Sequence, residues 1–480
     1  MTDASTARPP HALSAAELSA AYAAGTLTPE AAVDDVLAHI ARCEPALAAT
    51  WAPDADVARL DARAAAHASG LRWRAGTPLS PLDGVPVTLK ENIATQGVPV
   101  PLGTAATVLV PAAADAPPAA RLREAGAVVV AKTTMPDWGM LSSGLSSFHA
   151  LARNPWRTDL NPGGSSAGAA AAAAAGYGAI HVGTDIGGSV RLPASWCGVV
   201  GFKPSLGRIP IHPPYAGRVA GPLARTVTDV AWAMRALARP DARDTMSLPY
   251  QPIDWLALDD GDANLSGLRL GLLLDAGWGT PVAPAVRAAL EDAARRLEAA
   301  GARVMPMAPF STRAMADGMD RFWRMRSWLD FQKLAPAQQD QVLPYIRQWI
   351  ARGASLSGAE VFEGYSQMGA LRDAAVVACA PFDYVLSPVS PDVAFRADWA
   401  SPLNDPERPF EHIAFTLPCN MSEQPAISVN ASYDDAGLPI GLQVIGARHD
   451  DLGVLRVARA WEALRGPQRA WPEGPFEARR

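Results

Sequence analysis

A strand–helix–strand alternation in the second half of the chain limits its possible folds most strongly. The apolar run GLRLGLLLD at 267–275 predicts a buried strand, residues 286–301 predict an amphipathic helix that stops at a glycine, and 302–307 predict another strand. Short apolar runs predict further strands at 85–90, 127–132, 382–387 and 438–446. Alternation of this kind is typical of α/β folds. We therefore expect one large α/β domain.

The N-terminal stretch has a different pattern, which is helical. Ser14 begins the pattern of a capping box. Thr28 is a candidate N-cap with Pro29 at the first helical position, and apolar residues recur after it at helical spacing. Residues 56–76 also predict an amphipathic helix. We expect residues 1–75 to form a helical segment that packs on the core and carries no obvious chemistry.

Composition excludes several functional classes. The 480 residues are 49% hydrophobic, enough for a large core, and the net charge of −6 gives no sign of a nucleic-acid partner. No signal-peptide pattern and no run of about 20 apolar residues occurs, so we expect a cytoplasmic protein with no membrane partner. The histidines are scattered and the cysteines widely spaced, which favours no metal site and four buried free thiols, Cys43, Cys197, Cys379 and Cys419.

Three groups of polar residues stand in unusual settings. Lys90 ends an apolar strand, Ser165 and Ser166 directly precede a run of alanines, and Ser189 follows two glycines in DIGGSVR. Each has a structural explanation when taken alone. A lysine at a strand end is usually solvated, a serine before a helix is often its N-cap, and paired glycines often mark only a turn.

Together these residues make a chemical argument for nucleophilic catalysis. Serine is a poor nucleophile unless a base removes its proton, and a lysine can be that base when burial keeps it neutral. The apolar neighbours of Lys90 in VPVTLK could provide that burial. Successive backbone N–H groups of Ile186, Gly187, Gly188 and Ser189 can converge on one point and form an oxyanion hole.

The same stretches resemble the amidase signature family of serine hydrolases. Ser165 and Ser189 are 24 residues apart, as the paired serines of that family are. The match is dense over about 80–230 and weak in 245–375. The main matching stretches are PLDGVPVTLKENI (81–93), NPGGSSAGAAAAAAAG (161–176) and GTDIGGSVRLPASWCGVVGFKPS (183–205), supported by GPLARTVTDVA (221–231), LSPVSP (386–391) and QPAISVNASYDDAGLPIGLQVIG (424–446).

The resemblance implies a large mixed β-sheet covered by helices on both sides. It also implies one catalytic domain over 76–475, in which the divergent region 245–375 contributes to the substrate cleft. No cofactor is implied. The expected partner is a small-molecule amide or carbamate, bound by a monomer or a homodimer.

The resemblance further implies a Ser–cis-Ser–Lys triad. Ser189 would be the nucleophile, Ser165 the bridging serine after a cis peptide bond from Gly164, and Lys90 the final base. The N–H groups of residues 186–189 match the oxyanion hole of the family. The positions that match its supporting residues are Thr184, Asp185, Arg191 and Ser166.

Substrate preference is the least determined property. The family cleaves C–N bonds of amides, and the 14 tryptophans and the aromatic 310–375 stretch favour aryl amides, anilides or carbamates (urethanes). Within that stretch, one helical face carries residues that either pack in the core or cover an apolar substrate, namely Phe322, Met325, Trp328, Leu329 and Gln332. By their place in the motif, the expected substrate-binding residues are Trp138, Met140, Leu141 and Ser142.

Four positions depart from the usual pattern of the family. Ala167 stands in SSAG where SSGG or SSSG is commoner, and a residue this small should be tolerated. Asp137 stands where glutamate or glutamine is common, Glu423 where glycine is common, and Asn430 where proline is common. None of them belongs to the implied triad.

Other functions stay open at this point. A family member can be the amidase subunit of a transfer-RNA-dependent amidotransferase, or a nylon-oligomer or peptide amidase. GSSAG also fits the GxSxG pattern of α/β-hydrolases with Ser166 as nucleophile, which would need a late histidine such as His412 or His449. A binding protein that keeps the fold without catalysis is a third possibility.

Overall fold

The computed structural model describes residues 8–258, 265–474 and 476, and its centre is an 11-stranded mixed sheet. The strand order is β1-β3-β2-β4-β6-β5-β10-β11-β9-β7-β8. The strands are β1 (Thr50–Trp51), β2 (Pro86–Lys90), β3 (Val128–Thr133), β4 (Ile180–Asp185), β5 (Val200–Lys203), β6 (Val219–Ala224), β7 (Arg269–Leu272), β8 (Arg303–Pro306), β9 (Tyr384–Pro388), β10 (Ala426–Tyr433) and β11 (Pro439–Ile445). The α/β fold with a large mixed sheet is therefore confirmed.

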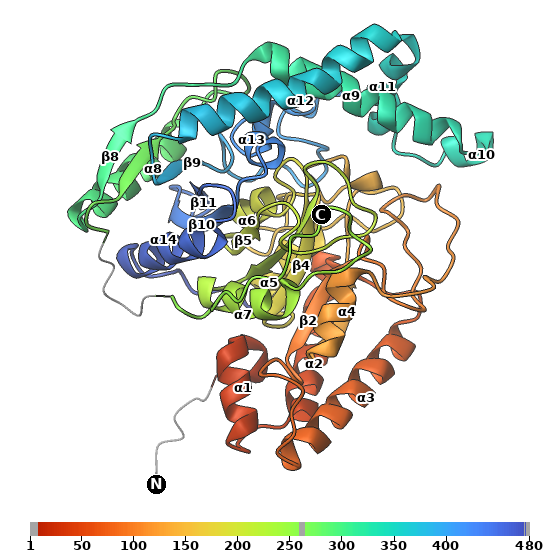
Figure 1. Cartoon of the computed structure of the whole chain (residues 1–480). Helices are drawn as coiled ribbons and strands as arrows, with labels where there is room; N and C mark the ends of the chain where they lie inside the picture. The colour runs from red at the N-terminus through yellow and green to blue at the C-terminus, as the bar shows by residue number, and fades with distance from the viewer. Residues whose placement is uncertain (1–7, 259–264, 475, 477–480) are drawn as a thin grey trace.

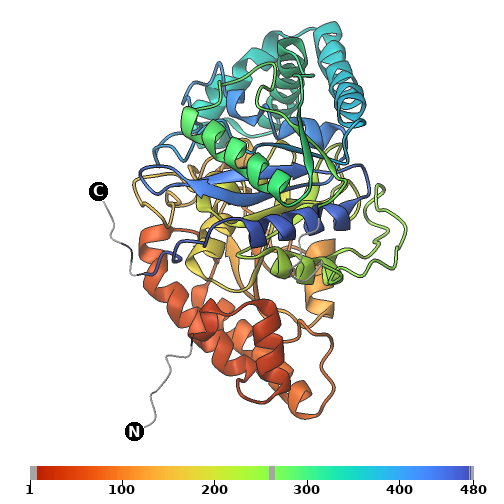
Figure 2. The ribbon, with the colours of Figure 1, turned by 90° about the vertical axis from the view of Figure 1, so that its left-hand side faces the viewer.

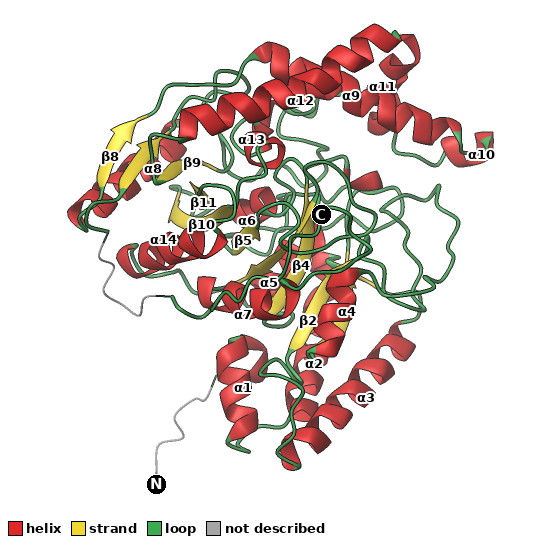
Figure 3. Ribbon diagram, in the orientation of Figure 1, coloured by secondary structure: helices red, strands yellow, loops and turns green. Residues whose placement is uncertain are grey.

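Helices cover both faces of this sheet, as Figures 1 and 3 show. One face carries α5 and α6, and the other carries α7, α8 and α14. The α-helices are α1 (Ala15–Ala23), α2 (Pro29–Leu47), α3 (Ala55–Arg74), α4 (Pro117–Glu124), α5 (Ala167–Ala175), α6 (Arg191–Cys197), α7 (Val227–Leu237), α8 (Pro284–Ala299), α9 (Arg313–Gln332), α10 (Pro336–Gln339), α11 (Pro344–Ala351), α12 (Gly358–Cys379), α13 (Leu417–Met421) and α14 (Asp451–Leu464).

Most of the remaining helices form two groups at opposite ends of the molecule. Helices α1, α2 and α3 lie at the lower end in Figure 1, while α9, α11 and α12 lie at the upper end. Figure 2, turned by 90°, shows the same separation with the sheet between the two groups. Among the described helices, none has the combination of length and hydropathy that a membrane crossing requires.

Strand pairing brings the chemically interesting residues to one edge of the sheet. Strand β2 lies between β3 and β4 and is parallel to both, with Leu89 opposite Val182. Because parallel strands end at the same edge, Lys90 at the end of β2 and Asp185 at the end of β4 lie on the same side. Loops that follow such strand ends are where α/β sheets bind ligands.

The capping residues and the strand–helix–strand unit predicted from the sequence are present in the structure. Ser14 completes a capping box, and Thr28 accepts a hydrogen bond from the Ala31 N–H with Pro29 at the first helical turn. The predicted strand–helix–strand unit is β7, α8 and β8, with the two strands parallel.

Three expectations need correction. The N-terminal segment is not helical throughout, because Thr50 and Trp51 form the short edge strand β1, which pairs with β3. Cys379 is free but only partly buried, whereas the other three cysteines are free and buried. On α9 the buried positions include Met319 and Trp323, while Leu329 is 50% exposed, so the inward face is rotated from the predicted one.

Two positions that depart from the family pattern lie where the backbone conformation is unusual. Glu423, where glycine is common in the family, has φ of +66°, a conformation that glycine adopts freely. Asn430, where proline is common, lies at an irregularity in the pairing of β10 with β11. Residues 1–7, 259–264 and 475, which belong to the predicted segments, lie outside the described residues.

Candidate active site

Lys90 is fully buried, although lysines at strand ends are usually solvated. Its Nζ lies 2.7 Å from Ser165 Oγ, 3.2 Å from Ser166 Oγ and 3.2 Å from Thr184 Oγ1. All three partners are hydroxyl groups, and no carboxylate forms an ion pair with Lys90 in the described part of the chain. An amine in such surroundings has lost its hydration without gaining a counter-ion.

The protonation of Lys90 follows from this environment. Burial, and to a smaller extent the positive charge of Arg218, lower the pKa of Lys90 to about 7 from the ordinary value of 10.5. Glu91 and Asp185 act in the opposite direction and only partly compensate. A substantial fraction of Lys90 is therefore a neutral amine near pH 7, which is the form that can accept a proton.

Ser165 and Ser166 approach Lys90 from the turn before α5. The peptide bond between Gly164 and Ser165 is cis, as the resemblance implied. Ser166 occupies the N-cap position of α5 but makes no capping hydrogen bond with its side chain. Its Oγ instead contacts Lys90 and donates to the Thr184 carbonyl oxygen at 3.3 Å. The simple N-cap explanation of Ser166 is thus wrong.

Ser189 lies in the tight loop between β4 and α6 and is partly exposed, unlike Ser165. Its carbonyl oxygen accepts a hydrogen bond of 3.0 Å from the Ser166 N–H, which joins the two serine-containing segments. Between the hydroxyls of Ser165 and Ser189, both described, no direct hydrogen bond is formed. The structure thus brings Lys90 and Ser165 into contact and places Ser189 on the adjoining loop.

Asp185 and Arg191 hold that loop from within. The Arg191 guanidinium donates to both carboxylate oxygens of Asp185, at 3.0 and 2.9 Å, and both side chains are fully buried. Burial alone would raise the pKa of Asp185, but the charge and hydrogen bonds of Arg191, with a bond from Asn420, hold it well below its usual range. A buried pair of this kind fixes geometry, because each charge needs the other.

The backbone N–H groups of the loop have different partners. The Gly188 N–H donates to Asp185 Oδ1 at 2.9 Å. Within the described residues, the N–H groups of Ile186, Gly187 and Ser189 donate to no protein acceptor. Gly188 has φ of +119°, and a Cβ there would lie 2.5 Å from Thr416 Oγ1, so only glycine fits.

The predicted substrate-binding residues occupy a segment beside the triad candidates. A Cβ at Gly139 would lie 3.2 Å from Ser165 Oγ, so this segment touches Ser165. Trp138 has φ of +52°, a left-handed conformation that is rare for a bulky residue, and such conformations cluster at functional sites. Met140 and Ser142 are half-buried like Trp138, whereas Leu141 is buried.

The aromatic helices pack against both this segment and the Ser189 loop. Trp138, Met140 and Leu141 belong to one apolar cluster with Trp323 of α9 and Trp349 of α11. A Cβ at Gly187 would lie 3.4 Å from the Trp323 ring and 3.4 Å from Ile413. The same helices therefore contribute to the core and border the loop that carries Ser189.

The histidines do not support the α/β-hydrolase alternative. His412 is buried against Trp196, with ring centroids 6.1 Å apart, and burial lowers its pKa to about 3. In the described structure Ser166 has hydrogen bonds to Lys90 and Thr184 and none to a histidine. A serine without a histidine partner lacks the base that this mechanism needs.

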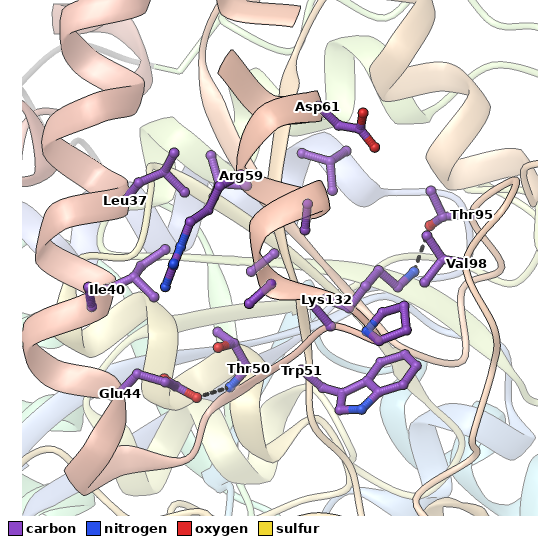
Figure 4. Close-up of a pocket in the computed structure, with 18 of the residues that line it drawn as sticks. Leu37, Ile40, Glu44, Thr50, Trp51, Arg59, Asp61, Thr95, Val98 and Lys132 are labelled. Atoms are coloured by element: carbon purple, nitrogen blue, oxygen red, sulfur yellow. Dashed lines mark hydrogen bonds between the residues drawn. The ribbon is translucent and has the colours of Figure 1, made fainter. Parts of the chain in front are cut away.

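A separate cavity of about 510 Å³ lies between α2, α3 and β3. Figure 4 shows Lys132, Trp51 and Glu44 among its lining residues, with Lys132 donating to Thr95 Oγ1 at 2.7 Å. None of the predicted site residues lines it. In the described part of the chain, no cluster of three or more His, Cys, Asp and Glu side chains could hold a metal ion.

Comparison with known proteins agrees with this geometry. The sequence model of the family described as Amidase matches residues 31–455, which is most of the chain. The chain belongs to the amidase signature family. As a member, this amidase is a hydrolase that acts on C–N bonds.

Relatives of this amidase have several specialised roles. It is 34% identical to the A subunit of the glutamyl-tRNA(Gln) amidotransferase of Myxococcus xanthus (strain DK1622), over 93% of this chain and 96% of that protein. Its structure resembles a bacterial aryl acylamidase of the family, with a TM-score of 0.86, 28% identity and coverage of 95% and 96%. It also resembles the peptide amidase of Stenotrophomonas maltophilia, with a TM-score of 0.79, 28% identity and coverage of 95% and 97%.

Several residues that shape the site of this amidase were not predicted to do so, although Gln443 lies in the matching stretch 424–446. Asn420 and Gln443 hydrogen-bond the Arg191 guanidinium at 2.7 Å each, and the Thr416 hydroxyl donates to the Gly187 carbonyl at 2.7 Å. They lie more than 200 positions from the loop they support. No local signal could have found such partners, because only the packing of α13 and β11 brings them there.

Proposed function

We propose that this amidase hydrolyses amides or carbamates that carry an apolar or aromatic group, through an acyl-enzyme on Ser189. Ser165 and Lys90 form the proton relay. The observation that carries the proposal is the buried Lys90 amine, with a pKa of about 7, at 2.7 Å from Ser165 Oγ. An adjacent neutral base is what a serine hydroxyl needs to become a nucleophile.

The hydrogen-bond partners of Lys90 indicate the direction in which the proton moves. A neutral amine has two N–H donors and one lone pair, and Lys90 has three hydroxyl partners. Ser166 donates its own proton to the Thr184 carbonyl, whereas the only side-chain bond of Ser165 among the described residues is with Lys90. We therefore assign the Lys90 lone pair to the Ser165 O–H, which leaves the lone pairs of Ser165 Oγ free to receive the Ser189 proton.

The reaction then proceeds in balanced steps. The Ser189 proton passes to Ser165 as the proton of Ser165 passes to Lys90, and Ser189 Oγ forms a bond with the substrate carbonyl carbon. When the C–N bond breaks, the proton returns from Lys90 through Ser165 to the leaving nitrogen. Water repeats the sequence on the acyl-enzyme, releases the acid and restores Ser189. With a carbamate, the acid released is a carbonic acid derivative.

The loop provides the oxyanion site. Of the four N–H groups that the sequence predicted, those of Ile186, Gly187 and Ser189 are without a protein acceptor in the described structure and are the proposed donors. The Gly188 N–H already binds Asp185, so its proposed role is to hold the loop. Each donor to the oxyanion is typically worth about 3 kcal/mol in the transition state.

The proposed supporting residues act on the loop or on Lys90, and not on the substrate. Asp185 and Arg191 fix the turn that carries Ser189, and Thr184 and Ser166 complete the hydroxyl shell around Lys90. Because a misplaced nucleophile loses much of its reactivity, these contacts are part of the proposed machinery.

Apolar and aromatic side chains beside the loop support the proposed substrate preference. Trp323 and Ile413 border Gly187, and Trp138 and Met140 lie on the segment that touches Ser165. Together with Leu141 and Ser142 of that segment, they are the proposed contacts of an aryl amide, anilide or urethane. The structural likeness to an aryl acylamidase supports the same choice.

A turnover panel tests this proposal. Wild type and Ser189→Ala are compared on an acetanilide, an aryl carbamate and acetamide, and Ser189 is probed by labelling with a fluorophosphonate. We expect labelling at Ser189, a preference for the aryl substrates over acetamide, and a loss of about 10³-fold or more in the variant. Absence of labelling would contradict the mechanism, and a preference for acetamide would contradict the substrate class.

A second candidate is the amidase subunit of a transfer-RNA-dependent amidotransferase. The observation in its favour is the likeness to glutamyl-tRNA(Gln) amidotransferase subunits over more than nine-tenths of the chain. Glutaminase activity and co-purification with partner subunits would support this candidate. Turnover of aryl amides by the isolated chain, without glutaminase activity, would support the first.

A further inference from the structure

Arg218 lies beside the catalytic loop proposed above. It immediately precedes β6, where Val219 pairs with Asp185 of the antiparallel strand β4. This register places Arg218 alongside Ile186, the first residue of the oxyanion loop. Arg218 is half-buried. Its positive charge contributes to the lowered pKa of Lys90.

A second guanidinium, that of Arg326, lies near the first. Arg326 follows Trp323 by three residues on α9, so the two share a side of that helix, and Trp323 borders Gly187. The Arg326 guanidinium lies 4.5 Å from the centre of the Tyr215 ring, three residues before Arg218. Burial, and then the positive charge of Arg326, lower the pKa of Arg218 to about 10.

Neither cation is neutralised. Within residues 8–258, 265–474 and 476, Arg218 and Arg326 take part in no ion pair, and Arg218 donates to the Pro213 carbonyl at 3.0 Å. Asp330, one turn further along α9, pairs with Lys333 at 2.8 Å. By contrast, the buried Arg191 and Arg324 each have an aspartate partner. A half-buried guanidinium, that of Arg218, with the exposed guanidinium of Arg326 near it favours an anion between the two.

We propose that Arg218 and Arg326 bind an anionic group of the substrate, a carboxylate, while the scissile carbonyl lies at Ser189. This inference rests on the proposed function and narrows its substrate class to aryl amides or carbamates that also carry an acid. The planar guanidinium suits a carboxylate because it can donate two parallel hydrogen bonds to it. The aromatic surroundings receive the ring, and the two arginines receive its charged substituent.

Two matched substrate pairs test the inference. In one pair the charge is on the amine part (4-acetamidobenzoate against 4-acetamidobenzamide), and in the other on the acyl part (4-carbamoylbenzoate against terephthalamide). The kcat/KM ratio of acid over neutral partner is measured for wild type, Arg218→Gln, Arg326→Gln and Arg287→Gln. Arg287 is the control, because it is a half-exposed arginine on α8 that pairs with Glu291.

We expect wild type to prefer the acid of one pair by about 10-fold or more, through a lower KM, as charge-assisted bonds predict. The ratio should fall to about 1 in Arg218→Gln, fall partly in Arg326→Gln and stay unchanged in Arg287→Gln. Arg326 is exposed on its helix, so its replacement keeps the test valid if the Arg218 variant misfolds.

A second readout does not depend on turnover. The acid of the preferred pair should protect Ser189 from fluorophosphonate labelling better than its neutral partner does, in wild type only. If Ser189 is labelled but neither the kcat/KM ratio nor the protection experiment shows a preference for an acid, the inference is wrong and the proposed function is unaffected. A ratio that survives both arginine replacements would also overturn it. Absence of labelling altogether would refute the proposed function itself.

Discussion

Replacing Lys90 with methionine should abolish turnover and yet stabilise the protein in a pH-dependent way. Methionine is close to lysine in shape and carries no charge. In the unfolded chain Lys90 titrates near its ordinary pKa of 10.5, whereas burial lowers the pKa to about 7 in the folded protein. Between these values the unfolded state binds the proton and the folded state does not, so the stability of the wild type rises with pH.

The size of the effect follows from the two pKa values. Keeping Lys90 buried costs the wild type about 4 kcal/mol at pH 7 and about 1 kcal/mol at pH 10. A methionine at this position would avoid the cost at both pH values but would lose the contacts with Ser165, Ser166 and Thr184, a loss that does not depend on pH in this range. The stability gained by Lys90→Met should therefore be about 3 kcal/mol larger at pH 7 than at pH 10.

Urea unfolding followed by tryptophan fluorescence measures this difference between the two proteins. Lys132 and Lys203 are also buried, but they are present in both proteins and cancel. Lys333→Met is the control, because the Lys333 side chain is 73% exposed and its replacement should give no comparable pH dependence. A gain that is equal at pH 7 and pH 10 would show that Lys90 is not neutral in the folded protein, and the relay argument would fail.

Three further outcomes are expected. The kcat/KM of a neutral amide should fall as the pH drops through about 7, since Lys90 then becomes protonated, and a profile flat to pH 5 would contradict its role as base. Gly188→Ala should lower kcat about 10²-fold, because its Cβ would push into Thr416 Oγ1 and displace the oxyanion loop. Asp185→Asn should lower the free energy of unfolding by about 3–5 kcal/mol in urea titrations, because Arg191 would stay buried without its counter-ion.

Particular residues show which features of the fold and the site could be predicted from the sequence. The boundaries of α2 and the β7–α8–β8 unit follow from capping residues and hydrophobic spacing, which act over a few positions. For Lys90 the apolar strand that carries it indicated a possible source of burial, but not the groups that surround the amine. The inward face of α9 was misplaced, because several of its faces carry large apolar residues and the neighbouring elements, α11, α12 and the turn at 352–355, decide which are covered.

The cis peptide bond before Ser165 and the pairing of Ser165 with Lys90 came from the family resemblance and not from the local pattern. The contacts of Asn420, Thr416 and Gln443 with the catalytic loop came from neither.

The amino-acid sequence by itself determined the α/β class, the glycine-rich loop, and the presence of a lysine and two serines suited to acyl transfer. Only the tertiary structure decided that the amine is sealed from water, that the Gly188 N–H binds Asp185, and that two arginines lie unpaired beside the loop in the described part of the chain. The physical reason is that desolvation and charge balance depend on every group within several ångströms, and those groups come from strands and helices far apart in the chain.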